Sequence, residues 1–335
     1  MKKKREIYLM KKYFFNYLLF LVLILWNFSD TEGRAYNNTN ILIPDITTEE
    51  TANEASKCNT LVAITVHFNS SRFHYLKQVL SSLSTFPKIQ IILITNTIKE
   101  NELKDLENLY RQILPDGVEG RNISIRSYPN LQDPFDLTWC HKEIITNEFL
   151  NNNSIYSHFI YLEDDIAFNF MNFVYFLEYR KLLRNEGLLP SFLRVEYQNK
   201  TGTFVNTDHQ KQINVLTQPF IEWNDLIFVN PPNPYMACFV LDKELAIEYV
   251  ATPSFNKIKS ANVVGWAVRE RSAMGLTFEV VPPRFQSRYV VPFFITNRQS
   301  PQCAWVFHLP NNYANDRKTR FGKVPMYSLF SLTKK

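Results

Sequence analysis

The chain is poor in the residue clusters that mark metal-rich and disulfide-rich proteins. It has four cysteines and six histidines in 335 residues, and no Cys-x-x-Cys pair that would suggest a zinc site. The cysteines are widely spaced, so they fit either two disulfide bonds in an oxidising compartment or buried free thiols. The scattered histidines also speak against a two-metal hydrolase, which needs several ligands close together.

The chain also lacks the glycine-rich motifs that bind the phosphates of nucleotides. Beyond residue 12 it has no net charge. No G-x-G-x-x-G follows the first predicted strand, which disfavours a dinucleotide-binding Rossmann domain, and no P-loop is present. The net charge of +5 comes entirely from residues 1–12, which hold six basic residues and one acidic residue. The remainder has 31 residues of each sign. We therefore expect no nucleic-acid-binding surface.

One long apolar run is present, close to the amino terminus. Residues 13–28 are apolar except for Asn16 and Asn27, and they follow a basic cluster, as in a membrane anchor whose basic end stays in the cytosol. We expect an uncleaved signal anchor, with residues 1–12 as a cytosolic tail, 29–57 as a stem and 58–335 as a lumenal domain. A cleaved signal peptide is the alternative interpretation.

Six N-x-S/T sequences agree with a secretory route, because this tripeptide is the acceptor for N-linked glycans. They begin at Asn27, Asn37, Asn69, Asn122, Asn152 and Asn199. Together with the apolar run, they predict a single-pass type II protein of the Golgi or endoplasmic reticulum membrane.

The first part of the lumenal region alternates between two hydrophobic periodicities. Short apolar, β-branched runs alternate with segments in which apolar residues recur at helical spacing. This alternation predicts a mostly parallel, doubly wound α/β sheet. The predicted strands are 60–68, 88–96, 122–128 and 156–166, and the predicted helices are 72–83, 102–114 and 138–150.

The remaining part shows the same periodicities less regularly. Residues 198–233 have the composition of a loop-rich insertion. Asp242 is expected to cap a helix over 243–250. The other predicted helices are 172–186 and 261–274, and the other predicted strands are 190–197, 236–241, 277–281 and 305–309.

Three acids stand together where the fourth predicted strand ends. Glu163, Asp164 and Asp165 follow a run of buried-strand residues, and apolar residues resume with Ile166. The carboxyl ends of strands in an open α/β sheet are where such folds bind ligands. Carboxylate oxygens there suit Mg²⁺ or Mn²⁺. A solvated acidic turn is the alternative.

Four stretches between residues 60 and 203 carry a family resemblance. They are VAITVHFNSSRFHYLKQVLSSL, LTWCHKEIITNEF followed by FIYLEDDI, NFVYFLEYRKLL, and PSFLRVEYQNKTG. In this order, with Glu-Asp-Asp at the end of a strand, they resemble a GT-A type nucleotide-sugar glycosyltransferase, most closely the N-acetylglucosaminyltransferase I type. The resemblance implies a GT-A-like catalytic domain over 58–335.

The resemblance also implies roles for the acids and for one late histidine. Asp165, the last acid of the motif, would ligate Mn²⁺ or Mg²⁺, and Glu163 and Asp164 would contact ribose, sugar or water. His308, at the end of a late predicted strand, is similar to the carboxy-terminal histidine that completes the metal or diphosphate site in many GT-A enzymes. A structural histidine is the alternative.

Three polar residues near the end of the first predicted strand are candidates for nucleotide binding. His67, Asn69 and Arg72 would contact uracil or phosphate, since they follow the carboxyl end of that strand. A plain turn before a helix is the alternative, and a glycan on Asn69 would conflict with a nucleotide role.

The catalytic base departs from the family pattern. The resembled family carries an acidic pair before a tryptophan on its late helix, whereas this chain has Val263, Val264 and Gly265 before Trp266. Glu270, four residues later, is the candidate base. An ion pair with a neighbouring arginine is its alternative role. The other acids considered as the base are Glu196, Glu222 and Asp225.

These observations together predict a metal-dependent glycosyltransferase. It would move a sugar from a UDP-sugar, with UDP-GlcNAc as one donor considered, to a glycan or glycoprotein acceptor. The membrane would be a partner through the amino-terminal helix. The alternatives are a catalytically inactive glycosyltransferase-like binding protein and a lumenal metal-dependent hydrolase.

Overall fold

The computed structural model describes residues 48–114 and 120–332. The predicted cytosolic tail, signal anchor and nearly all of the stem lie outside the described residues. Within those two ranges, none of the helices combines the length and the apolar character that crossing a bilayer requires.

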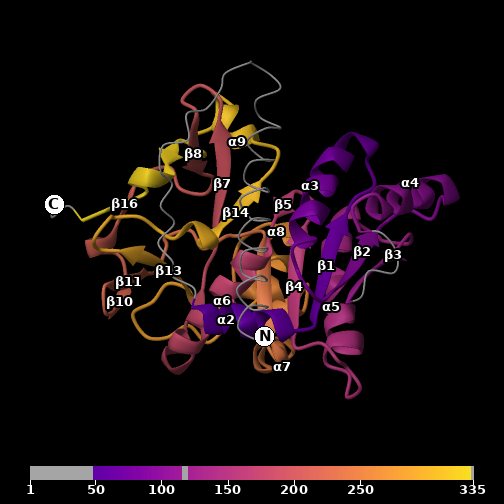
Figure 1. Ribbon diagram of the computed structural model, residues 1–335, viewed down its shortest axis with the longest axis horizontal. Helices are drawn as coiled ribbons and strands as arrows, with labels where there is room; N and C mark the ends of the chain where they lie inside the picture. Colours follow the sequence, from indigo (N-terminus) through magenta and orange to yellow (C-terminus); the bar gives the residue numbers. More distant parts are fainter. Residues whose placement is uncertain (1–47, 115–119, 333–335) are drawn as a thin grey trace, which may run out of the picture.

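A five-stranded sheet forms the part of the molecule at the right of Figure 1. Its strand order is β12-β4-β1-β2-β3, and only β12 runs antiparallel to its neighbour. The prediction of an α/β protein with a mostly parallel sheet is therefore confirmed. The strands are β1 (Thr60–Val66), β2 (Ile89–Thr95), β3 (Arg121–Ser127), β4 (His158–Glu163) and β12 (Cys238–Asp242).

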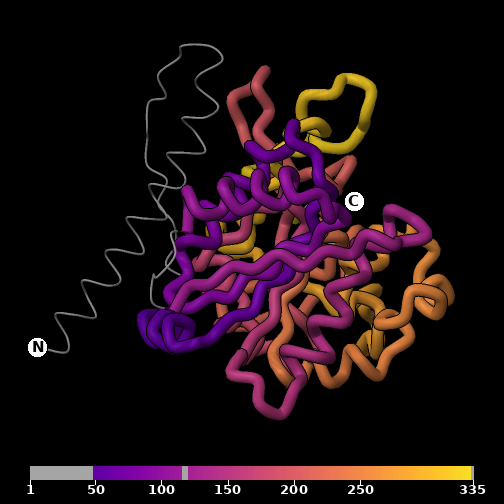
Figure 2. Tube along the Cα trace, turned by 90° about the vertical axis from the view of Figure 1, so that its right-hand side faces the viewer, coloured from indigo at the N-terminus to yellow at the C-terminus, as the bar shows by residue number. Residues whose placement is uncertain are grey.

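Helices connect these parallel strands and lie on both faces of the sheet. Figure 2 shows the purple helices α3 and α4 on one side of the strands and the magenta helical segment that precedes β4 on the other. The amino-terminal helix is α2 (Glu49–Lys57), and the connecting helices are α3 (Phe73–Leu83), α4 (Glu100–Arg111) and α5 (His141–Ile144), which continues as a π-helix over Ile145–Phe149.

The strand order places a topological switch point between β1 and β4. The chain proceeds from β1 outward to β2 and β3, and then returns to the opposite side of β1 with β4. Thr65, near the end of β1, pairs in register with Glu163 at the end of β4. Ligands of open α/β sheets bind at this crevice, outside the carboxyl ends of the strands.

Three further sheets, one of them also five-stranded, form the other part of the molecule, at the left and top of Figure 1. Their orders are β15-β8-β7-β14-β5, β10-β11-β13-β6 and β16-β9. The strands are β5 (Ile166–Ala167), β6 (Leu189–Pro190), β7 (Leu193–Gln198), β8 (Thr203–Asn206), β9 (Ile213–Asn214), β10 (Phe220–Trp223), β11 (Leu226–Val229), β13 (Tyr289–Phe294), β14 (Trp305–His308), β15 (Val324–Pro325) and β16 (Phe330–Ser331).

Helix α6 (Phe170–Leu183) is buried and packs against several of these elements. Asn169 begins it with a capping box, in which Oδ1 of Asn172 accepts a hydrogen bond from the backbone nitrogen of Asn169. The Nδ2 of Asn172 then donates to the carbonyl oxygens of Cys303 and Trp305, both at 2.8 Å. Because the helix is apolar on nearly all sides, other parts of the protein can pack against every side of it.

The predicted cap of the next helix is confirmed. Asp242 accepts a hydrogen bond from the backbone nitrogen of Leu245 at 2.7 Å, and α7 (Lys243–Val250) follows it. The last helices, α8 (Val268–Ser272) and α9 (Asn312–Asn315), are short. All four cysteines are free thiols in the structure.

Three predicted segments differ from the structure. The helix expected over 261–274 is wrong, because the chain forms only a short 3-10 turn and α8, with two β-branched residues and Gly265 between them. The strand expected over 277–281 is wrong, because Val280 has a φ of 47°, which a strand does not allow. Residues 198–233, expected as a loop-rich insertion, contain the four short strands β8 to β11 with loops between them.

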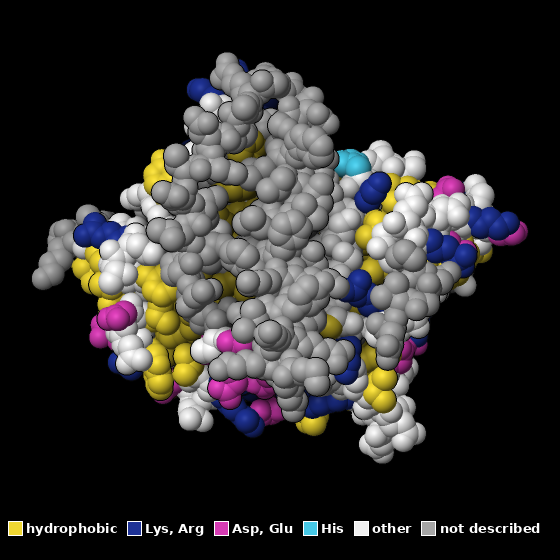
Figure 3. Space-filling model, in the orientation of Figure 1, with side chains coloured by type: hydrophobic (Ala, Val, Ile, Leu, Met, Phe, Trp, Pro, Cys, Tyr) yellow, Lys and Arg dark blue, Asp and Glu magenta, His cyan; other side chains and the backbone are white. Residues whose placement is uncertain are grey.

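Apolar side chains are visible at the end of the molecule that carries β10, β11 and β13 (Figure 3). Among the exposed apolar residues there are Phe220 and Trp223 on β10 and Ile295 just after β13. This end lies away from the switch point in Figure 1.

Candidate functional site

The three predicted acids form the connection between the two large sheets. Glu163 ends β4, Asp164 and Asp165 make a turn, and Ile166 begins β5. The expected strand over 156–166 is thus split, because its last residues join a different sheet. Ile166 pairs with His308 of β14, and the backbone nitrogen of Leu309 donates to the carbonyl oxygen of Asp165 at 3.0 Å. This pairing brings Asp165 and His308 together.

A cavity of about 400 Å³ lies at this junction. Residues from β1, the 3-10 helix Ser70–Arg72, the acidic turn, β7, α8 and β14 converge on it from distant parts of the sequence. The predicted site residues that line it are His67, Arg72, Glu163, Asp164, Asp165, Glu270 and His308.

Asn69 is the predicted site residue that does not line this cavity. Its side chain accepts hydrogen bonds from the backbone nitrogen of Ser71 at 3.0 Å and from the Ser71 hydroxyl at 2.7 Å. It therefore caps the 3-10 helix Ser70–Arg72, the turn that was its alternative interpretation.

A larger hollow of about 810 Å³ lies elsewhere, beside α2. Asn59 and Ser157, which line it, precede β1 and β4, so this hollow is at the amino ends of the parallel strands. Ligands of such sheets bind at the carboxyl ends. The smaller cavity, where charged groups converge, is therefore the better candidate for a functional site.

Arg72 neutralises two of the three acids. Its Nη2 atom lies 2.7 Å from Oδ1 of Asp164 and 2.7 Å from Oδ2 of Asp165. Its Nε donates to the second oxygen of Asp164 at 3.2 Å. The side chains of Asp164 and Asp165 are only 11% and 10% exposed, so this guanidinium compensates charge that water screens poorly.

Two of the three acids, Glu163 and Asp164, have raised pKa values. Burial raises the pKa of the Asp164 carboxyl to about 6, although the Arg72 hydrogen bond opposes the shift. Burial and the neighbouring charge of Asp165 raise the pKa of Glu163 to about 8. The Oε1 of Glu163 accepts a hydrogen bond from the hydroxyl of Tyr235 at 3.1 Å. The carboxylates around this cavity give it an excess of negative charge, which favours the binding of a cation.

Asp165 has an oxygen without a partner. Its Oδ1 is buried and has no hydrogen bond within the described residues. The Nε2 atom of His308 lies 3.7 Å from Oδ2 of the same carboxylate, which is too long for a hydrogen bond. A buried acceptor left unpaired destabilises the folded state by about 1–3 kcal/mol. A positively charged ligand in contact with this oxygen would remove that penalty.

These residues fit a divalent cation that the substrate helps to hold. Across 48–114 and 120–332, no group of three or more His, Cys, Asp or Glu side chains is arranged as a complete metal site. Mg²⁺ and ions of similar size are usually bound through one or two carboxylates plus substrate phosphates, and not by an all-protein cage. Asp165 and His308 would be the protein ligands of such an ion.

Glu270 enters the cavity from α8. Its Oε1 accepts a hydrogen bond from Nε of Arg269 at 2.8 Å. Its Oε2 is buried and has no hydrogen-bond partner in the described part of the chain. The sequence offered two alternatives for Glu270, an ion pair with an arginine and an acid that faces the cavity. The structure combines them, because Oε1 pairs with Arg269 and Oε2 is left without a partner among the described residues.

Two groups at the site were not among the sequence candidates. Arg194 on β7 is buried, forms a two-point ion pair with Asp208, and lies with its guanidinium carbon 4.7 Å from the ring centroid of Tyr235. Arg194 and Tyr235 both line the cavity. The available signal was an arginine between two apolar residues of a strand, Leu193 and Val195, where a charge is rarely buried without a partner.

Neither a protein-family model nor a curated protein matches this chain. The chemistry of the cavity is therefore inferred from its own geometry. The site combines buried carboxylates, a guanidinium beside them and a separate acid with one unpartnered oxygen. Such a set can bind a cation with an anionic group and can accept a proton from a neutral nucleophile.

Proposed function

We propose that this protein is a metal-dependent glycosyltransferase of the GT-A type. It transfers a sugar from a UDP-sugar to a glycan or glycoprotein acceptor, with its catalytic domain in the lumen of the secretory pathway. The observation that carries this proposal is the unpartnered Oδ1 of Asp165, beside His308 and Arg72 at the switch point of a mostly parallel sheet.

The leaving group explains the charges around the cavity. A nucleoside diphosphate departs with growing negative charge, and a bound Mn²⁺ or Mg²⁺ supplies Lewis-acid stabilisation of that charge. Asp165 and His308 hold the cation. Arg72, freed from part of its pairing with the acids, supplies a guanidinium that bonds phosphate oxygens at two points.

The acceptor requires a group that takes its proton. Oε2 of Glu270 accepts this proton from the acceptor hydroxyl, while Arg269 holds Oε1 and so orients the carboxylate. Glu196, an alternative base, is unsuited to the role because both of its oxygens already accept hydrogen bonds from the protein. Glu222 and Asp225 are exposed and do not line the cavity.

The experiment that tests the proposal uses the purified full chain and a panel of nucleotide sugars. Release of free nucleotide and labelling of glycan acceptors are measured with and without Mn²⁺, in the wild type and in Asp165→Asn. Asp225→Asn, which changes an exposed acid in the same way, is the matched control. We expect release that depends on Mn²⁺, is lost in Asp165→Asn and is kept in Asp225→Asn.

Other outcomes select the alternatives. Mn²⁺-dependent binding of UDP without transfer to any acceptor would indicate a binding protein that keeps the fold. Metal-dependent cleavage of the donor or of simple phosphate esters, with no sugar transferred, would indicate a hydrolase. Absence of both binding and release would refute the assignment of the acidic motif.

A further inference from the structure

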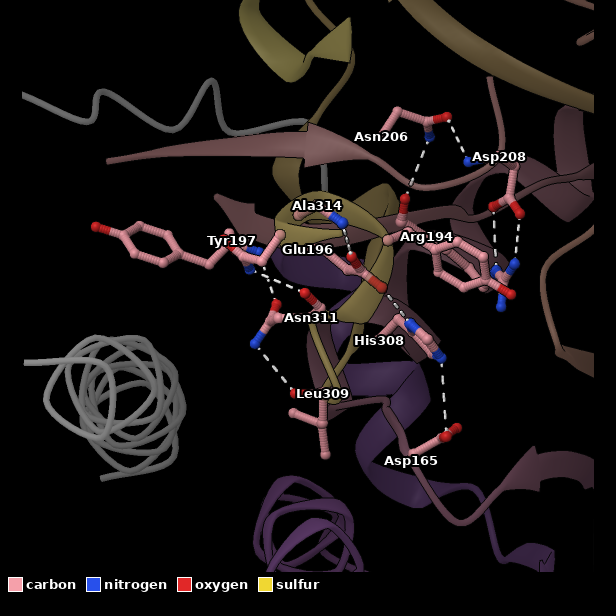
Figure 4. Close-up of polar contacts among 12 residues, drawn as sticks. Asp165, Arg194, Glu196, Tyr197, Asn206, Asp208, His308, Leu309, Asn311 and Ala314 are labelled. Atoms are coloured by element: carbon pink, nitrogen blue, oxygen red, sulfur yellow. Dashed lines mark hydrogen bonds and ion pairs between the residues drawn. The ribbon is translucent and has the colours of Figure 1, made fainter. Parts of the chain in front are cut away.

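One carboxylate lies behind the proposed metal ligand and has no role in the reaction described above. Glu196 is on β7, and its side chain is fully buried. Its Oε1 hydrogen-bonds Nδ1 of His308, and its Oε2 accepts a hydrogen bond from the backbone nitrogen of Ala314 (Figure 4). Each oxygen of the carboxylate therefore faces a different partner.

The sheet itself brings this carboxylate to the histidine. β7 and β14 are parallel neighbours, with Val195 opposite Phe307. The next residues along the two strands are Glu196 and His308, which both turn toward the side of the sheet opposite Val195 and Phe307 because side chains alternate along a strand. The contact joins residues 112 apart in sequence and is fixed by the strand register.

The orientation of the imidazole follows from this contact. An ionised carboxylate only accepts hydrogen bonds, so Nδ1 of His308 must carry a proton to bond Glu196. In the neutral ring the other nitrogen, Nε2, then has a free lone pair. In Figure 4 this nitrogen is directed toward Asp165, whose Oδ2 is 3.7 Å away.

We infer that Glu196 is a positioning residue that fixes the Nδ1–H tautomer of His308, so that Nε2 faces the cation site beside Asp165. This inference rests on the proposed function, because that function places a cation there. Partners that hold the second nitrogen of a metal-binding histidine typically contribute ten- to a hundredfold to metal affinity.

Glu196 also links the histidine to a segment that borders the cavity. The backbone nitrogen that it accepts from belongs to α9, and Tyr313 in the same turn lines the cavity. The Oδ1 of Asn311 accepts a hydrogen bond from the backbone nitrogen of Tyr197, the residue after Glu196, at 2.7 Å. The turn is therefore built on the strand that orients His308.

The substitution Glu196→Gln tests this role without changing the size of the side chain. The Gln oxygen can still accept from Ala314, but its amide group then donates toward Nδ1 of His308. That exchange reverses the tautomer, placing the proton on Nε2 and removing the lone pair from the cation site. Volume and the number of hydrogen bonds are kept, so a change in tautomer is separable from unfolding.

The first readout is the tautomer of His308, measured by long-range ¹H–¹⁵N correlation on the ¹⁵N-histidine-labelled full chain without metal. Signals are assigned with His308→Gln. We expect Nδ1–H in the wild type and Nε2–H in Glu196→Gln. A wild-type Nε2–H tautomer, or an unchanged tautomer in the variant, would overturn the inference, and the wild-type result does not require Glu196→Gln to fold.

The second readout is the affinity for Mn²⁺ alone, measured by calorimetry. We expect Glu196→Gln to lose about ten- to a hundredfold in affinity. Glu248→Gln changes a carboxylate that pairs with Arg288 elsewhere, and it should leave both readouts unchanged. Equal affinity of wild type and Glu196→Gln would overturn the inference alone. Equal affinity of wild type and Asp165→Asn would instead count against the proposed function.

Discussion

Arg72 and Asp164, 92 residues apart in the sequence, form a two-point ion pair at the carboxyl edge of the parallel sheet. The Nη2 atom of Arg72 lies 2.7 Å from Oδ1, and its Nε lies 3.2 Å from Oδ2. The same Nη2 reaches Asp165 at 2.7 Å. One cationic side chain therefore compensates two buried acids in the structure without a ligand.

Removing this cation should make stability depend on an added one. In Arg72→Met, the two acids lose their compensating charge, and we expect the free energy of unfolding to fall by about 1–3 kcal/mol. Mn²⁺ binds only the folded state at this site and replaces the lost charge. Mn²⁺ should therefore raise the Tm of the variant more than that of the wild type, as measured by scanning calorimetry.

The matched control for this comparison is Arg317→Met, which removes an exposed arginine. It should leave both the Tm and its response to Mn²⁺ close to those of the wild type. If Arg72→Met were as stable as the wild type and responded no more strongly to Mn²⁺, Arg72 would not be the group that balances the acids.

Glu270→Gln should separate donor binding from transfer. The variant keeps the hydrogen bond from Arg269 through its amide oxygen but can no longer accept the acceptor proton. We expect the transfer rate to fall by about 10²–10⁴, the usual contribution of a general base, while donor affinity stays unchanged. Initial rates and equilibrium binding of the UDP-sugar measure the two effects.

The control for this base is Glu222→Gln, because Glu222 is an exposed acid on β10 that does not line the cavity. It should transfer at the wild-type rate. Full activity in Glu270→Gln together with a large loss in Glu222→Gln would show that the base enters from the other side of the site.

A half-buried histidine far from the proposed reaction should give the fold a measurable acid sensitivity. Burial lowers the pKa of His158 to about 4 from its ordinary value near 6.5. Since the unfolded chain binds the proton and the folded chain does not, stability is lost as pH falls from about 6.5 toward 4. The full effect of this group is about 3 kcal/mol.

Denaturant unfolding of the wild type and His158→Phe at pH 7 and pH 5 measures this contribution. The difference in unfolding free energy between the two pH values should be smaller in His158→Phe. His74→Gln, which changes an exposed histidine, should keep the wild-type difference. An identical pH response in all three proteins would mean that His158 is protonated in the folded state.

Local patterns in the sequence predict those elements that carry their own signal. β1, β2 and the helices between them are recognisable because each has a buried-strand or amphipathic periodicity over adjacent residues. β11 was assigned to a loop because it is only four residues long, and β13 was missed because Pro292 interrupts its pattern. These two strands also pair with each other across a long stretch of the chain. Leu226 pairs with Phe294, and no local pattern encodes that pairing.

The candidate site shows the same limit. The acidic motif and His308 were identifiable by position, since both end apolar strands, and the structure places them on one cavity. The contacts that orient them were not identifiable. Glu196 was considered as a free base, yet the register between β7 and β14 commits both of its oxygens to His308 and Ala314.

Lys142 offers a test of how the core tolerates a buried amine. Its Nζ has no hydrogen-bond partner within the residues that the structure describes, and burial lowers its pKa well below the ordinary value. Four aromatic rings surround it, with the Nζ at distances of 3.9 to 5.8 Å from their centroids. They belong to Trp139, Phe239, Tyr249 and Phe255.

Lys142→Met should therefore stabilise the protein at neutral pH by on the order of 2 kcal/mol, because an apolar chain of similar length replaces an unpaired polar group. The unfolded lysine keeps its proton to about pH 10, so wild-type stability should rise between pH 7 and 9, and this rise should shrink in Lys142→Met. Lys104→Met, at an exposed ion pair, should change neither quantity appreciably. A clear loss of stability in Lys142→Met would instead show that Lys142 is charged and that the four rings hold it by cation–π attraction.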